Sequence, residues 1–123
     1  MSLLYNSALN SLAIHVAQSR SAMGQHAAAD IASEIRACLT KQPGVRIIFA
    51  AAPSQSEMLA ALRVEKDIDW SSVTAFHMDE YLGLSTDAPQ RFGLWLRRAI
   101  FDHLPFAGVH LLLTRGQSCA SRR

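Results

Sequence analysis

The hydrophobic positions of this chain follow two periods that alternate along the sequence. From Ser21, apolar residues recur at near-helical spacing with polar residues or alanine between them, which predicts a helix that ends at the Gln-Pro-Gly segment 42–44. The run at 45–50 is apolar apart from Arg46 and contains β-branched residues, which predicts a strand buried on both faces. The apolar positions of the predicted helix are Met23, Ala27, Ile31, Ile35 and Leu39.

The same alternation continues to the end of the chain. We expect a helix from Gln55 to about Glu65, a strand at 73–78, and a helix that Pro89 opens and Pro105 ends. A last strand is expected at 109–113, and a short apolar piece precedes the first helix at 12–16. Alternating helices and strands predict an α/β protein, in which right-handed crossovers join the strands of a parallel sheet.

Length and composition predict one domain with a substantial core, because the chain has 123 residues and half of them are hydrophobic. The net charge of +2 and the scattered basic residues argue against nucleic-acid binding. Polar residues interrupt the N-terminal region, so we expect no signal peptide, and no run is long enough to span a membrane. The two cysteines, Cys38 and Cys119, have no metal-binding spacing, and the chain is expected to be cytoplasmic.

The turn after the first predicted strand is a candidate phosphate site. Its residues are small, and the N-terminus of the following helix offers free N–H groups and a positive dipole end to an anion. In the alternative, Ser54 and Glu57 form a capping box that uses those donors internally and adds a negative charge. The candidate binding residues are Ala52, Pro53, Ser54 and Gln55.

A second candidate site follows the next strand, at Asp79, Glu80 and Tyr81. Adjacent carboxylates on an extended chain point to opposite sides, so one can face a pocket while the other caps backbone or pairs with a base. A partly buried carboxylate at a cleft can act as a general base. The alternative is a loop acid that only caps the following turn.

The histidines predict no metal site. His77 lies two residues before Asp79, on the same side of a regular strand, but no third ligand follows nearby. The other histidines are dispersed and are expected at the surface or at helix ends: His15, His26, His103 and His110.

Three segments together resemble the glucosamine-6-phosphate deaminase family, within the sugar-phosphate isomerase and 6-phosphogluconolactonase superfamily. They are Phe-His-Met-Asp-Glu-Tyr-Leu-Gly-Leu at 76–84, Pro-Gln-Arg-Phe at 89–92 and Phe-Asp-His at 101–103. The stretch at 47–62 resembles the family's strand, phosphate loop and helix, so the resemblance covers roughly residues 12–112. It implies a Rossmann-like three-layer α/β/α fold with a parallel sheet, here truncated.

The resemblance also implies an activity, the conversion of an amino-sugar phosphate to a ketose phosphate and ammonia. Asp79 matches the general base that moves a proton between the first two sugar carbons, and Ser54 matches the phosphate-loop threonine. Glu80 and Tyr81 are expected beside the substrate, and the family implies no cofactor and no metal. The lactonase branch has arginine where this chain has Tyr81, which favours the deaminase branch.

Two departures from the family pattern bear on function. The phosphate turn is Ala-Ala-Pro-Ser-Gln instead of a Gly-Gly-Thr-Pro type loop, and the family's ring-opening histidine and phosphate-clamping basic residues have no counterpart here. We expect residues 1–113 to be the N-terminal part of one sugar-phosphate isomerase-like domain and 114–123 to be an aberrant or disordered tail. An incomplete deaminase with weak or no activity is therefore expected; a lactonase-like hydrolase, a non-catalytic binding module and a homo-oligomer remain alternatives.

Overall fold

The computed structural model describes residues 3–9 and 11–112. Its elements alternate as the hydrophobic pattern predicts, after an N-terminal pair of strands that the pattern did not predict. In chain order they are β1 (Leu3–Leu9), β2 (Leu12–Ala17), α1 (Arg20–Leu39), β3 (Val45–Phe49), α2 (Ser56–Arg63), β4 (Val73–His77), α3 (Phe92–Ala99) and β5 (Gly108–His110). The predicted tail at 114–123 lies outside the described residues.

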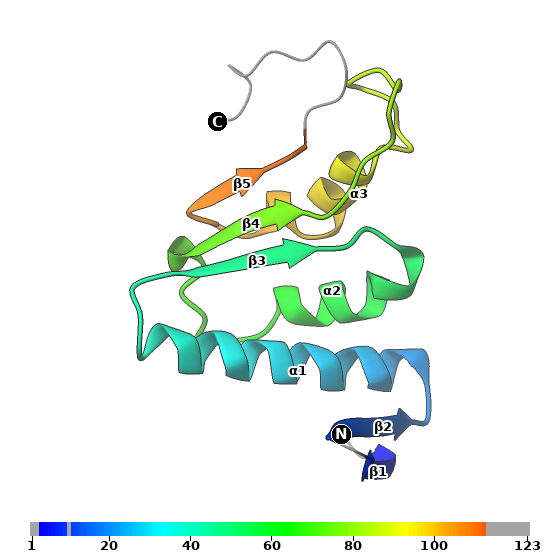
Figure 1. Cartoon of the computed structure of the whole chain (residues 1–123), viewed down its shortest axis with the longest axis vertical. Helices are drawn as coiled ribbons and strands as arrows, with labels where there is room; N and C mark the ends of the chain where they lie inside the picture. The colour runs from blue at the N-terminus through cyan, green and yellow to red at the C-terminus, as the bar shows by residue number, and fades with distance from the viewer. Residues whose placement is uncertain (1–2, 10, 113–123) are drawn as a thin grey trace.

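The strands β3, β4 and β5 form a parallel sheet in that order, which confirms the predicted α/β class (Figure 1). Val45 lies opposite Val73 and Phe49 opposite His77, so β3 and β4 start and stop at the same level. The apolar piece at 12–16 belongs to β2, which pairs with β1 in an antiparallel hairpin.

The helices of the described residues cover one face of the sheet, so these residues supply two of the three layers that the resemblance implies. Side chains alternate between the two faces of a strand, and the residues Phe49, Val73 and Ala75 are buried in one core with residues of the helices. On the other face Ile48 and Met78 are 68% and 59% exposed, so the prediction that the first parallel strand is buried on both faces is wrong. The helical residues of the core are Ala28, Ala32, Ile35, Leu59, Leu62, Leu96 and Ile100.

Helix α1 begins at a capping serine and packs closely on α2. The Ser19 side chain accepts a hydrogen bond from the Ala22 N–H at 3.1 Å, which satisfies one of the free donors of the first turn. At Gly24 an added Cβ would lie 2.8 Å from backbone and Cβ atoms of Glu57, so the close contact between α1 and α2 requires glycine. Among the described residues, no helix is both long enough and apolar enough to cross a membrane.

Candidate functional site

The two predicted site segments meet at the carboxyl edge of the sheet. Because β3 and β4 end at the level of the Phe49–His77 pair, the turn at 50–55 and the segment 78–81 leave the sheet side by side. The loop at 82–91 then returns the chain to α3, as Figure 1 shows. In open parallel sheets this edge is where ligands bind.

A cavity of about 190 Å³ lies between the phosphate turn and the start of α3. It brings the predicted binding residues Ala52 and Pro53 against Trp95 of α3. Ser54 and Asp79 are not among its lining residues. The complete lining is Ala51, Ala52, Pro53, Pro89, Gln90, Phe92 and Trp95. This volume is smaller than the roughly 300 Å³ at which ligand pockets begin.

The capping-box alternative at the phosphate turn is wrong. Residues Pro53–Gln55 form a short 3₁₀ turn before α2, which places Gln55 at the helix cap, and in the part of the chain that the structure describes no side chain caps either element. The Glu57 carboxylate instead accepts a hydrogen bond from the Arg20 guanidinium at 3.1 Å, and the same nitrogen donates to the Pro53 carbonyl at 3.1 Å. Arg20 therefore offsets the negative charge that would repel a phosphate at this turn.

Glu80 is the carboxylate of the pair that caps backbone. Its side chain is 3% exposed and accepts hydrogen bonds from the N–H groups of Phe92 and Gly93, both at 2.9 Å, at the start of α3. Burial by itself would raise the pKa of Glu80, but the hydrogen bonds from Gly93, Phe92 and Tyr81 and the charge of Arg91 outweigh it, so the pKa is lowered. This anchor explains why α3 begins at Phe92 and not at Pro89, where the sequence predicted it.

Two buried bases surround the Glu80 carboxylate. The Arg91 guanidinium donates to the Thr86 carbonyl at 2.9 Å, and its Nε lies 3.5 Å from the Glu80 oxygen. The His77 ring is 1% exposed, with Nε2 3.8 Å from Glu80, and neither ring nitrogen has a hydrogen bond to any described residue. Burial lowers the pKa of His77, and Glu80 opposes this shift only in part.

Asp79 and Tyr81 face solvent. Both residues are exposed, so the expected opposite directions of Asp79 and Glu80 are confirmed. The Tyr81 ring lies against Phe92 with a centroid separation of 4.6 Å, which ties the segment after β4 to α3. The described residues do not provide the partial burial that was expected of a general base at this position.

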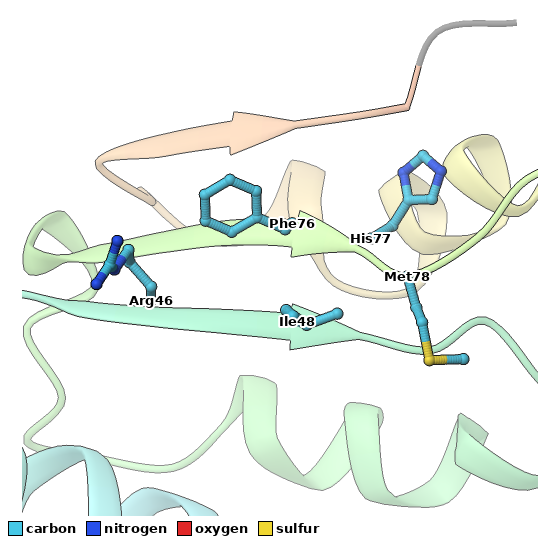
Figure 2. Close-up of a pocket in the computed structure, with 5 residues that line it drawn as sticks. All are labelled: Arg46, Ile48, Phe76, His77 and Met78. Carbon is cyan, nitrogen blue, oxygen red and sulfur yellow. The ribbon is translucent and has the colours of Figure 1, made fainter.

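A wider depression of about 460 Å³ lies on the bare side of the sheet, lined by Arg46, Ile48, Phe76, His77 and Met78 (Figure 2). The Phe76 ring stacks on His110 with centroids 4.9 Å apart, while Ile48 and Met78 leave apolar surface open. None of the predicted site residues lines this depression.

No family model matches the chain. The chain is, however, similar in sequence to curated proteins. The chain is 32% identical over 63 residues to a glucosamine-6-phosphate deaminase of Lactobacillus helveticus, covering 51% of this chain and 26% of that protein. It is 27% identical over 106 residues to one of Alkaliphilus metalliredigens, covering 85% of this chain and 43% of the relative. The predicted resemblance to glucosamine-6-phosphate deaminases is confirmed.

Solved structures of deaminase and lactonase type share the fold. A monomeric glucosamine-6-phosphate deaminase superposes with a TM-score of 0.69 at 18% identity, over 85% of this chain and 44% of that one. A 6-phosphogluconolactonase from Shewanella baltica superposes with a TM-score of 0.67 at 20% identity, over 81% and 42%. The predicted Rossmann-like fold is thereby confirmed, and the chain spans less than half the length of these relatives.

Proposed function

We propose that this chain contributes a general base and part of a phosphate site to the isomerisation and deamination of an amino-sugar phosphate. The observation that carries the proposal is the similarity to glucosamine-6-phosphate deaminases over 85% of the chain. The arrangement of the carboxylates supports it, because Glu80 is used to hold α3 while Asp79 is free to meet a ligand at the sheet edge.

In the proposed reaction, Asp79 takes the proton from C2 of the open-chain amino sugar and returns it to C1. A fixed carboxylate can do both on one face of the planar enolamine, and water then replaces the amine to give fructose 6-phosphate and ammonia. The phosphate binds at Ala52, Pro53, Ser54 and Gln55, where the dipole of α2 favours an anion and Arg20 offsets the charge of Glu57. Tyr81 forms part of the substrate wall, and the substrate contact predicted for Glu80 becomes an indirect one through α3.

A complete catalytic cycle needs further groups. Ring opening and protonation of the leaving amine call for an acid besides Asp79, and the small cavity at the turn does not enclose a hexose phosphate. We therefore expect the 123-residue chain alone to turn over glucosamine 6-phosphate slowly or not at all, in keeping with its coverage of 43% of a deaminase.

The test is an ammonia-release assay on glucosamine 6-phosphate, combined with calorimetric measurement of substrate binding. We expect weak binding that Ser54→Ala reduces, and turnover at the detection limit. Asp79→Asn removes any residual turnover, whereas Asp102→Asn, at an exposed acid in the turn between α3 and β5, leaves it unchanged. Full turnover that Asp79→Asn abolishes would contradict the expectation that this chain lacks catalytic groups. Turnover that survives Asp79→Asn would contradict the role of Asp79 as the general base.

The fold favours one further enzymatic candidate, hydrolysis of a sugar-phosphate lactone, because a 6-phosphogluconolactonase superposes nearly as well as the deaminase. Lactone hydrolysis measured beside ammonia release separates the two activities.

A third candidate is a non-catalytic binding or assembly module, which the exposed Ile48 and Met78 on the bare sheet face favour. Under this reading the chain self-associates, so a monomer in light scattering at high concentration argues against it.

A further inference from the structure

A cluster of potential metal ligands lies where β2 runs beside α1, on the side of this helix that faces away from the sheet (Figure 1). His26 and Asp30 are one turn apart on α1, with Nε2 and Oδ2 3.4 Å from each other. β2 runs beside the first half of this helix (Figure 1) and brings His15 over the pair, so that the two imidazole centroids are 4.8 Å apart. One ligand atom from each of the three residues lies within 4.8 Å of the other two.

One ring nitrogen of His26 lacks a hydrogen-bond partner among the described residues. This nitrogen, Nε2, is shielded from solvent. The Asp30 oxygen is at ion-pair distance, yet no hydrogen bond joins the two groups. A shielded ring nitrogen without a partner is costly, and a cation between His26 and Asp30 would satisfy both groups at once.

The spacing suits a tetrahedral ion. Ligands at about 2.0–2.1 Å from Zn²⁺ are about 3.3 Å from each other, and the His26–Asp30 pair already has this separation. His15 has to approach by only about 1.5 Å to complete the tetrahedral spacing, and its exposed side chain leaves room for that rotation. Two imidazoles and one carboxylate favour Zn²⁺ and its first-row neighbours over Mg²⁺ or Ca²⁺, which prefer oxygen ligands alone.

We propose that His15, His26 and Asp30 bind a divalent first-row transition metal ion, Zn²⁺ foremost, with water in the fourth position. The ion joins β2 to α1 and thereby fastens the N-terminal hairpin to the helical layer. The site is independent of the proposed sugar-phosphate chemistry, because none of its ligands lies at the carboxyl edge of the sheet.

The experiment is a Zn²⁺ titration of the full 123-residue chain, by competition with a chromophoric chelator at pH 7.5. Cys38 and Cys119 are replaced by serine in the background, so that no thiolate competes for the ion. We expect one Zn²⁺ per chain with micromolar affinity, a rise in melting temperature that EDTA reverses, and the visible spectrum of tetrahedral Co²⁺ when cobalt is substituted.

The variants His15→Ala, His26→Ala and Asp30→Asn should each weaken binding at least tenfold. His103→Ala and His110→Ala, which remove exposed histidines elsewhere, should leave it unchanged. Circular dichroism of each variant without metal checks that it is folded. The proposal is overturned if no binding is measured in the micromolar range, or if the two control variants weaken binding as much as the three ligand variants.

Discussion

Removing the Glu80 carboxylate should destabilise the whole domain more than its position in a loop suggests. It accepts two hydrogen bonds of 2.9 Å from the first N–H groups of α3, and hydrogen bonds to a charged acceptor contribute about 1.5–3 kcal/mol each. It also faces the guanidinium of Arg91, a residue only 6% exposed. Leaving a buried charge unpaired costs about 3–5 kcal/mol. These contributions overlap, so we expect Glu80→Ala to lower the free energy of unfolding by about 3–5 kcal/mol.

The assay is urea unfolding followed by far-ultraviolet circular dichroism at pH 7. Glu80→Gln keeps one oxygen acceptor and should cost about half as much as the alanine variant, which keeps the test usable if the alanine variant does not fold. The matched control is Asp79→Asn, the adjacent but exposed carboxylate, which should leave stability unchanged within error.

The pH dependence gives the same prediction a second readout. Because the folded-state pKa of Glu80 is lowered, its stabilisation is complete above the unfolded-state value of about 4.3 and is lost as the pH falls through the folded value. The difference in stability between wild type and Glu80→Gln should therefore shrink below pH 4. A Glu80→Ala variant as stable as the wild type, or an Asp79→Asn variant that loses as much, would refute the assignment of the two carboxylates.

Three further predictions concern single residues. Gly24→Ala should destabilise the domain by about 1–3 kcal/mol in urea unfolding, because the new Cβ meets the Glu57 backbone at 2.8 Å; Gln25→Ala, on the exposed side of α1, should not. Burial lowers the pKa of His77, so below pH 6.5 protons bind the unfolded chain preferentially and the free energy of unfolding of the wild type falls by up to about 1.4 kcal/mol per pH unit. His77→Leu should remove this pH dependence. An unchanged slope in the leucine variant would contradict this. Arg20→Gln should cost no more than about 1 kcal/mol, since its ion pair with Glu57 is largely exposed, yet weaken phosphate binding measured by calorimetry.

Much of the fold was predictable because its signals are local. Helix α1 and strands β3 and β4 carry their periods in consecutive residues, and their observed bounds lie within about two residues of the expected ones. The start of α3 was misplaced because its anchor, Glu80, is twelve residues away from Phe92. The capping box failed for a similar reason: Arg20, far away in sequence, takes the Glu57 carboxylate that a local pattern assigned to the helix cap.

For the candidate site, the sequence alone determined that two carboxylates follow β4 and point to opposite sides, because side-chain alternation along an extended chain is a local property. Which of them is buried was decided only by the tertiary structure, through the N–H groups of α3 that meet Glu80. The exposed sheet face and the approach of His15 to His26 were decided in the same way. Residue order encodes the period of each element, whereas the groups that meet across elements depend on how the elements pack.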